Sequence, residues 1–321
     1  MKITVTEDVF PLARAFTISR GSKTEARVIT ATIEDGGFTG RGEGLPYPRY
    51  NETVQSAAEL INGLPSCVTR ESLQDLLPGG AARAAVDGAF WDLEAKRSGK
   101  RVWQLAGLPD PKPVTTAYTL SLEDPATMRE QAAQNAWRPL LKIKLGGEGG
   151  IARLEAVREG APRPRIIIDA NEGWTAESYS EMAPALIRLG VEMVEQPLPA
   201  GDDDALGDLD RVLPVCADES CHDRASLADL RGKYDMINIK LDKTGGLTEA
   251  LALRAAAEAD GFKVMVGCMV ESSLSIAPAV LVAQGVDVVD LDAPLLLGAD
   301  RRHALKFDDA GLHPSTPELW G

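Results

Sequence analysis

The stretch Leu140-Leu141-Lys142-Ile143-Lys144-Leu145 contains the pattern that decides the fold. It is a short apolar run with lysines at alternate positions, and a glycine-containing turn and an Ala-, Leu- and Glu-rich stretch of helical character follow it. The polar residues that close this run and its successors lie 22 to 28 residues apart, which suits one strand, one helix and two short loops. The successors are Arg165–Asn171, Val191–Pro197, Val215–Ser220, Met236–Asp242, Lys263–Met269 and Val286–Asp292.

An eighth run, Thr116–Leu122, precedes this series. Eight strands that alternate with helical stretches predict a barrel of the (β/α)8 type with a parallel sheet. The last strand is followed by Pro294-Leu295-Leu296-Leu297-Gly298 instead of a full helix. We therefore expect a modified TIM barrel, (β/α)7β, over residues 113–296.

Residues 1–112 have a different pattern. Residues 2–6 and 27–33 alternate apolar and polar side chains, and the turn Glu34-Asp35-Gly36-Gly37 follows the second stretch, which predicts a small antiparallel meander. Two segments of helical period come next, at about 53–62 and 80–97. This predicts an α+β capping domain over residues 1–112, and we expect residues from about 297 to 321 to return to it.

The composition is that of an ordinary globular protein, with 44% hydrophobic and 26% charged residues. The net charge of −14 argues against binding to nucleic acid or to an anionic membrane surface. The chain has no transmembrane-length apolar run, no signal-type apolar segment at its start and four scattered cysteines. These features predict a cytoplasmic protein with reduced thiols, and they leave a homo-oligomer possible.

Carboxylates close three consecutive strands of the predicted barrel. In such barrels the carboxyl ends of the strands face the active site, so Asp169, Glu195 and Asp218 are expected to converge on one wall. Three oxygen donors without histidine or cysteine suit a hard divalent cation such as Mg²⁺. The three histidines of the chain lie outside these strand ends, which argues against zinc.

Lysines close two strands on opposite sides of the predicted barrel. Because strand side chains alternate, Lys142 and Lys144 are both expected to point inward, as are Lys240 with Asp242 and Asp290 with Asp292. Lys144 lies on the second strand and Lys240 on the sixth, so a substrate held between them would have one base on each face. Two such bases can invert a stereocentre. We expect repulsion from Lys142 and from the cation to favour neutral Lys144, and the cation to stabilise an enolate.

A structural network of ion pairs is the alternative to an active site. One buried pair would justify that interpretation, because buried charges need partners. Seven strands that each end in polar or ionisable residues favour a functional site instead.

Five motifs at the strand ends together resemble the muconate-lactonizing subgroup of the enolase superfamily. They are Lys142-Ile143-Lys144, Asp169-Ala170-Asn171, Glu195-Gln196-Pro197, Asp218-Glu219-Ser220 and Lys240-Leu241-Asp242-Lys243-Thr244-Gly245-Gly246. Within the subgroup, Asp290-Leu291-Asp292 resembles the dipeptide epimerases, and Arg20 in the stretch 18–22 resembles the specificity loop of L-Ala-D/L-Glu epimerases. The resemblance covers the whole chain.

The resemblance implies a role for each of these residues. Asp169, Glu195 and Asp218 would bind Mg²⁺, while Lys144 and Lys240 would be the acid/base catalysts. The other implied roles concern the substrate: Lys142 would contact its carboxylate, Asp290 and Asp292 its N-terminal ammonium, Arg20 a glutamyl carboxylate, and Thr119, Cys268 and Val270 would line the pocket.

Three further residues have less direct implied roles. Lys23 could share or replace the role of Arg20, whereas Asn171 and Glu271 are expected to support the site through hydrogen bonds. The implied function is epimerisation of a dipeptide, L-Ala-D-Glu to L-Ala-L-Glu, in the recycling of murein peptides.

Other functions remain open at this point. A dipeptide epimerase of broader specificity, an N-acylamino-acid racemase, an o-succinylbenzoate synthase or a cycloisomerase would share the metal and the lysines. The substrates of the last three enzymes have no ammonium group to pair with Asp290 and Asp292. A Schiff-base aldolase would use one lysine and would not need three carboxylates. A barrel that binds Mg²⁺ without turnover would not need competent residues at every catalytic position.

Overall fold

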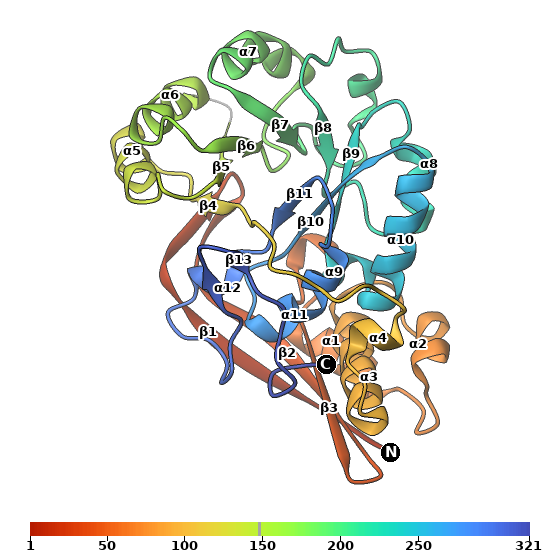
Figure 1. Cartoon of the computed structure of the whole chain (residues 1–321). Coiled ribbons are helices and arrows are strands. Elements are labelled where there is room, and N and C mark those ends of the chain that lie inside the picture. The colour runs from red at the N-terminus through yellow and green to blue at the C-terminus, as the bar shows by residue number, and fades with distance from the viewer. Residues whose placement is uncertain (147–148) are drawn as a thin grey trace.

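The computed structural model describes residues 1–146 and 149–321. Figure 1 shows a barrel beside a smaller lobe, and the long strands of that lobe run along one side of the barrel. The smaller lobe begins with an antiparallel sheet in the order β1-β2-β3, which confirms the predicted meander. Its strands are β1 (Lys2–Ile18), β2 (Gly21–Asp35) and β3 (Phe38–Gly44).

Helices complete this lobe. The two predicted segments are helical, as α1 and α3, and threonine N-caps begin α1 and α2 by accepting a backbone hydrogen bond. The helices are α1 (Val54–Asn62), α2 (Arg70–Leu76), α3 (Ala81–Ser98) and α4 (Val102–Leu105), and the 3₁₀ turn η1 (Pro48–Tyr50) precedes them.

Strand β3 packs against α3 through glycines. Gly40, Gly42 and Gly44 alternate along the strand, and a Cβ atom on any of them would collide with a backbone carbonyl oxygen of α3. The helix therefore rests directly on the backbone of the strand. Only glycine permits so close an approach.

The barrel contains the eight strands that the sequence predicts, in parallel and in chain order. The Ala117 N–H donates to the Val289 carbonyl at 2.8 Å, which links the first strand to the last. The strands are β4 (Tyr118–Leu120), β5 (Leu140–Lys144), β6 (Arg165–Asp169), β7 (Val191–Glu195), β8 (Val215–Ala217), β9 (Met236–Ile239), β10 (Lys263–Gly267) and β11 (Val288–Asp290).

The helical layer is less regular than the repeat predicts. Only the short 3₁₀ helix η2 (Asp204–Gly207) joins β7 to β8, where the sequence pattern indicates a helix. That connection contains Pro197, Pro199 and Gly201, which disfavour a regular helix. The other connections are α5 (Pro125–Gln134), α6 (Gly150–Gly160), α7 (Ala176–Arg188), η3 (Arg224–Ser226), α8 (Leu227–Leu230), α9 (Leu241–Thr244), α10 (Leu247–Ala259), α11 (Ser273–Val282) and α12 (Ala293–Leu296).

The barrel is filled by apolar side chains below the strand ends. One buried residue from each of the eight strand segments forms a single layer: Ala117, Leu140, Ile167, Met193, Cys216, Met236, Met265 and Val288. Polar side chains above this layer thus rest on a packed floor.

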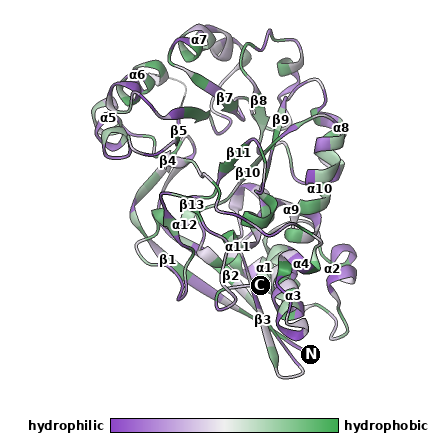
Figure 2. Cartoon of the chain, in the orientation of Figure 1, coloured by the Kyte–Doolittle hydropathy of each residue, from purple (hydrophilic) through white to green (hydrophobic). Residues whose placement is uncertain are grey.

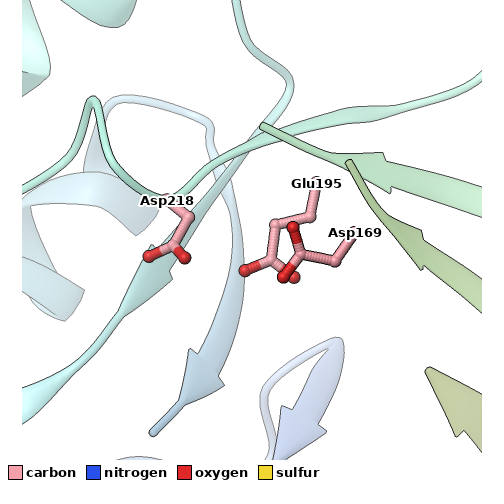
Figure 3. Close-up of side chains that lie close together, drawn as sticks. All are labelled: Asp169, Glu195 and Asp218. Carbon is pink, nitrogen blue, oxygen red and sulfur yellow. The ribbon is translucent and has the colours of Figure 1, made fainter. Parts of the chain in front are cut away.

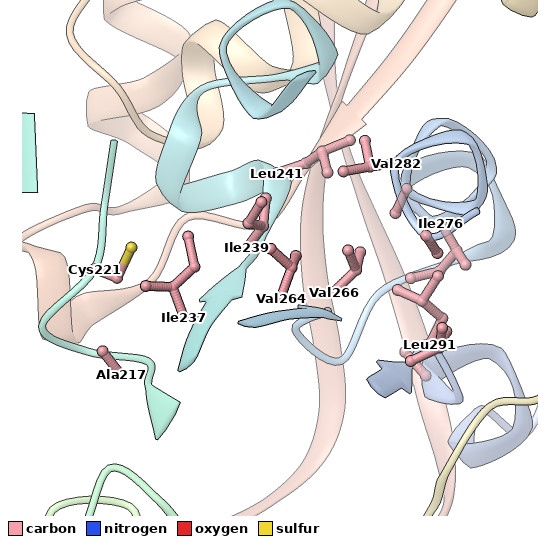
Figure 4. Close-up of a cluster of buried hydrophobic side chains, with 14 of the residues drawn as sticks. Ala217, Cys221, Ile237, Ile239, Leu241, Val264, Val266, Ile276, Val282 and Leu291 are labelled. Atoms are coloured by element: carbon pink, nitrogen blue, oxygen red, sulfur yellow. The ribbon is translucent and has the colours of Figure 1, made fainter. Parts of the chain in front are cut away.

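A second apolar layer lies between the strands and the outer helices. Figure 4 shows outward-facing strand residues such as Ile237, Ile239 and Val264 in one hydrophobic cluster with Ile276 and Val282 of α11. All ten residues of α11 are buried. In Figure 2 strands β10 and β11 are hydrophobic while the outer helices carry hydrophilic residues, as expected for helices with one buried face.

The last residues lie against the capping lobe. Following the hairpin of β12 (Phe307–Asp308) and β13 (Gly311–Leu312), the indole of Trp320 donates to the Gly88 carbonyl of α3 at 2.9 Å. The Gly321 N–H donates to Asp92 of the same helix, also at 2.9 Å. The boundary at 112/113 between the two domains stays a prediction.

Trp320→Ala is expected to lower the free energy of unfolding by about 3–5 kcal/mol, because the substitution opens a cavity in a packed core. Trp320 is only 1% exposed, whereas Trp137 is 63% exposed. Trp137→Ala is therefore the matched control and should change stability by less than about 0.5 kcal/mol. Urea unfolding followed by circular dichroism measures both values, and equal losses in the two variants would contradict this view of the C-terminal segment.

No helix among residues 1–146 and 149–321 is both long enough and apolar enough to cross a membrane.

Candidate active site

Three carboxylates meet at the carboxyl ends of β6, β7 and β8. Asp169 and Glu195 are the last residues of β6 and β7 and pair in register, and Asp218 directly follows β8. All three are buried, and one oxygen from each lies within 4.8 Å of the others. Figure 3 shows the three side chains turned toward one another. The predicted cluster therefore exists, and its all-oxygen donor set fits a hard divalent cation.

The three predicted lysines lie next to these carboxylates. The Lys142 Nζ atom lies 2.7 Å from Glu195 and 3.2 Å from Asp169. The Lys144 Nζ atom lies 2.7 Å from Asp169, and the Lys240 Nζ atom lies 2.6 Å from Asp218. Lys144 is on β5 and Lys240 follows β9, four strands further around a sheet of eight. The two lysines thus come from opposite sides of the barrel and line one pocket.

The ion pairs set the charge of the lysines. Burial disfavours the ammonium form of Lys240, but the carboxylates of Asp218 and Glu195 outweigh it and hold the pKa of Lys240 well above its usual value. Burial likewise opposes the charge on Lys142, and its carboxylate neighbours raise the pKa of that lysine. From the sequence we predict repulsion of Lys144 by the ammonium of Lys142, but in the structure Lys142 is surrounded by carboxylates. With protein side chains alone, attraction to carboxylates dominates there.

Glu195 is the least favourably ionised member of the triad. Burial, and then repulsion from Asp169, raises the pKa of Glu195 to about 8. Its Oε2 atom accepts no hydrogen bond within the described residues, although Lys142 lies close to it. A buried oxygen without a hydrogen bond next to two other carboxylates is a donor that fits a cation.

Two residues near the triad, Asn238 and Lys243, were not predicted as site residues from the sequence. The Asn238 amide donates to Glu195 at 2.7 Å, and the Lys243 Nζ atom lies 2.6 Å from the second oxygen of Asp218. Asn238 lies two residues before Lys240 in the sequence, so the period of two contained this signal. Lys243 reaches the site only because the chain turns into α9, which strand alternation does not reveal.

The predicted pairing of Lys240 and Asp242 on one inward face is wrong. Strand β9 ends at Ile239, and Lys240 is the N-cap of α9 (Leu241–Thr244). Asp242 therefore turns away and accepts the Leu45 N–H of the capping lobe at 2.7 Å. It joins the two lobes instead of facing the substrate.

A pocket between the lobes lies over the triad. Lys142, Lys144, Asp218 and Lys240 form its floor, and the capping lobe contributes Arg20, Lys23, Tyr47 and Tyr50. The other predicted residues that line it are Thr119, Asn171, Cys268, Val270, Asp290 and Asp292. Tyr47 and Tyr50 were not predicted, because they come from a loop that contacts the barrel only through the tertiary fold.

The two aspartates at the end of β11, Asp290 and Asp292, face the pocket together. Asp290 lies 2.6 Å from the Lys142 Nζ atom, and Asp292 accepts the Thr119 N–H at 2.6 Å. Burial, and then repulsion from Asp290, raises the pKa of Asp292 to about 7. The Oδ1 atom of Asp290 has no hydrogen bond within the described residues. This pair therefore offers negative charge to a cationic group of a ligand.

Glu271 lies outside the lining of this pocket. It accepts hydrogen bonds from the Met269 N–H at 3.3 Å and the Ser275 hydroxyl at 2.8 Å. Glu271 thus holds the loop after β10, where Cys268 and Val270 lie. The backbone N–H of Asn171 donates to Asp169 at 2.8 Å, so this residue also orients a member of the triad.

Arg20 is already paired in the structure. One terminal nitrogen lies 2.9 Å from Glu172 and 3.0 Å from the Asn171 carbonyl, and the other lies 2.7 Å from Glu219. Both ends of the guanidinium thus contact the loops after β6 and β8. The predicted contact with a substrate carboxylate would compete with these pairs.

Both lobes match families with known members. Residues 1–107 match the N-terminal domain of mandelate racemase and muconate lactonizing enzyme, and residues 127–304 match the enolase C-terminal domain-like family. The chain is 45% identical to the L-Ala-D/L-Glu epimerase of Escherichia coli (strain K12), over 97% of this chain and 99% of the relative. It is 42% identical to an N-acetyl-D-glutamate racemase from a Pseudoalteromonas species, over 92% of this chain and 95% of the relative.

A solved structure shares nearly the whole fold. It is an enolase family member from Agrobacterium tumefaciens, described as having homology to dipeptide epimerases, with bound sodium and L-Ala-L-Glu. It is 52% identical, with a TM-score of 0.97 and 99% of each chain covered.

The capped barrel, its carboxylate triad and its opposed lysines define an isomerase of the enolase superfamily. Within that superfamily, the chain belongs to the mandelate racemase/muconate lactonizing enzyme family, among the dipeptide epimerases.

Proposed function

We propose that the protein epimerises dipeptides at the α-carbon of the C-terminal residue in a Mg²⁺-dependent reaction, with L-Ala-D-Glu and L-Ala-L-Glu as the preferred pair. The observation that carries this proposal is the placement of Lys144 and Lys240 on opposite sides of one pocket. The aspartate pair in the same pocket supports a substrate with a free ammonium.

Asp169, Glu195 and Asp218 would hold the Mg²⁺ ion. When bound, the ion would neutralise these carboxylates and stabilise the negative charge that develops on the substrate carboxylate as the α-proton leaves. Asn238 and Lys243 keep Glu195 and Asp218 oriented. The apolar floor of the barrel keeps these charges out of bulk water, which strengthens their interactions.

The lysines would move the proton. Lys144 and Lys240 each contact one triad carboxylate, so the same residues that bind the metal also fix the two Nζ atoms. One lysine would remove the α-proton and the other would deliver a proton to the opposite face. Lys142, held by Glu195 and Asp290, would contact the substrate carboxylate.

The second candidate is racemisation of an N-acylated acidic amino acid. The N-acetyl-D-glutamate racemase at 42% identity favours it. Asp290 and Asp292 argue against it, because an N-acyl group has no ammonium to pair with two buried carboxylates.

Proton NMR in D₂O tests the proposal. The protein and Mg²⁺ are incubated separately with L-Ala-L-Glu, L-Ala-D-Glu and N-acetyl-D-glutamate. Loss of the glutamyl α-proton signal together with formation of the other diastereomer is the expected result for both dipeptides. Turnover of the N-acetyl compound alone would overturn the dipeptide assignment in favour of the second candidate. A role in recycling murein peptides is part of the proposal and would need L-Ala-D-Glu as a substrate.

The efficiency with dipeptides is expected to fall below pH 7. The pKa of about 7 means that Asp292 takes up a proton as the pH falls, and a neutral carboxyl cannot pair with the ammonium. kcat/KM for L-Ala-L-Glu should then fall by about tenfold per pH unit below 7. Asp292→Asn is the matched variant: it should be about 10²-fold less efficient at pH 8 and should lack this acidic limb. An unchanged acidic limb in Asp292→Asn would assign the titration to another group.

A further inference from the structure

A buried aspartate lies in the short helix α9, which begins directly after Lys240. Lys240 is the N-cap of this helix, and its carbonyl accepts the N–H groups of Lys243 and Thr244, each at 3.0 Å. Asp242 lies between these residues in the sequence and is only 2% exposed. Because Lys240 and Asp242 belong to one turn of backbone, the contacts that hold Asp242 also help to fix the position of Lys240.

The two oxygens of Asp242 differ in their surroundings. The Oδ1 atom accepts the Leu45 N–H of the capping lobe at 2.7 Å. The Oδ2 atom is buried and receives no hydrogen bond from any donor among residues 1–146 and 149–321. The carboxyl group of Asp242 is also in hydrogen-bonding contact with that of Glu271, in the loop after β10. Since Leu45 occupies Oδ1, Oδ2 is the atom that remains for Glu271.

Glu271 already has a donor for each of its oxygens. Oε1 accepts the Met269 N–H at 3.3 Å, and Oε2 accepts the Ser275 hydroxyl at 2.8 Å. Two ionised carboxylates repel each other and have no hydrogen to donate, so a hydrogen bond between them needs one proton. Because Glu271 accepts on both oxygens whereas Oδ2 of Asp242 accepts nothing, the arrangement places that proton on Asp242.

The charges around this pair do not favour a second negative charge. Burial, and then repulsion from Glu271, holds the pKa of Asp242 well above its usual value. Most of the nearby cations have other partners: Lys240 and Lys243 pair with Asp218, Arg83 donates to the Thr244 carbonyl, Arg301 pairs with Glu43, Arg49 with Glu172, and His222 contacts the Glu219 carbonyl. Lys23 attracts Glu271, but no ion pair joins the two in the described part of the chain. Glu43 and Glu52 add further repulsion.

We propose that Asp242 is a protonated carboxyl that donates a hydrogen bond to Glu271, and that through this bond Asp242 is a positioning residue for Lys240. The bond joins α9 to the loop that carries Val270, which lines the substrate pocket. Leu45, which donates to Asp242, packs in one apolar cluster with Val270, so the capping lobe closes the same junction. The role toward Lys240 rests on the proposed epimerase function, whereas the proton on Asp242 does not depend on it.

Urea unfolding at several pH values tests for the proton. A folded state that keeps a proton on Asp242, and an unfolded state that releases it above about pH 4, make wild type less stable as the pH rises. Asp242→Asn has no such proton to release, although its amide can still donate to Glu271 and accept from Leu45. The equilibrium constant for unfolding of wild type, divided by that of Asp242→Asn, should therefore rise about tenfold per pH unit from about pH 5 to about pH 7.

Asp110→Asn is the matched control, because it makes the same change at a side chain that is 64% exposed. The ratio of wild type to this control should stay constant over the same pH range. A constant ratio for Asp242→Asn as well would mean that Asp242 is ionised in the folded protein, and this would overturn the proposal.

Exchange of the substrate α-proton in D₂O tests the role toward Lys240, with Mg²⁺ and each pure diastereomer of L-Ala-Glu. Lys240→Ala identifies the diastereomer that Lys240 serves, since it should no longer exchange that one. Asp242→Ala should slow exchange of the same diastereomer by about 10²-fold, the cost of a base misplaced by about 1 Å. The other diastereomer should exchange at close to the wild-type rate, because Asp169 holds Lys144. Asp242→Asn should restore the lost exchange, and circular dichroism confirms that each variant is folded.

Equal slowing of both diastereomers in Asp242→Ala, or no recovery in Asp242→Asn, would overturn the positioning role. A wild-type protein that exchanges neither dipeptide would instead overturn the proposed function, and the role toward Lys240 with it. The unfolding ratio would still decide whether Asp242 carries a proton, so the two failures are distinguishable.

Discussion

Lys144→Ala and Lys240→Ala are each expected to lower kcat for epimerisation by about 10³-fold or more, the upper range for loss of a general acid or base. Each variant should nevertheless exchange the α-proton of one diastereomer with solvent deuterium. The remaining lysine can still remove a proton from its own face and return a deuteron to the same face. The two variants should therefore act on opposite diastereomers.

The geometry gives the reason for this complementary behaviour. The two lysines come from strands four positions apart in an eight-stranded barrel, and each is held by a different carboxylate. Neither can reach the face that the other serves without leaving its carboxylate and crossing the pocket. The loss of one lysine thus removes one direction of proton transfer and leaves the other.

Proton NMR in D₂O with each pure diastereomer measures exchange and inversion separately. Lys112→Ala is the control, because the Lys112 side chain is 72% exposed and pairs with Asp110 at the surface. This control should match wild type. If one variant exchanged both diastereomers at the wild-type rate, a single base would serve both faces and the two-base scheme would fail.

The barrel was predictable because its signal is local and repeated. Each strand carries its own alternation, and residues such as Asp169, Glu195 and Asp218 are placed by the rule that strand ends meet at one edge. The alternation of side chains along a strand gave a wrong prediction at Asp242. Alternation continues from Met236 through Asp242 in the sequence, but the backbone changes from strand to helix at Lys240. A period of two carries no information about where a strand ends.

The contacts between the lobes were not predictable. Arg20 pairs with Glu219, 199 positions away, and its interpretation as a substrate ligand depended on resemblance alone. The region around residues 47–50 likewise reaches the pocket only through the packing of one lobe on the other. Such contacts depend on the relative placement of two lobes, which no local pattern encodes.

Removal of divalent cations is expected to abolish epimerisation, and Glu195→Gln should have the same effect. Glu195 is the most telling position in the triad. Burial and Asp169 already make its negative charge unfavourable, with a pKa raised to about 8, so this carboxylate gains most from a cation. Loss of charge stabilisation at the substrate carboxylate should cost a factor on the order of 10³ or more in kcat.

Thermal unfolding separates metal binding from catalysis in the same experiment. Because a ligand stabilises the state that binds it, Mg²⁺ at about 100 times its Kd should stabilise wild type by about 2.7 kcal/mol. Glu195→Gln should remain folded, since its Oε1 atom can still accept the hydrogen bond from Asn238, but Mg²⁺ should no longer shift its Tm. Asn238→Ala should keep a reduced shift, because it removes only the partner that orients Glu195. Two outcomes would show that the triad is not the divalent site on which the chemistry depends. One is that Na⁺ restores the activity of chelator-treated wild type as fully as Mg²⁺ does. The other is that Mg²⁺ raises the Tm of Glu195→Gln as much as it raises that of wild type.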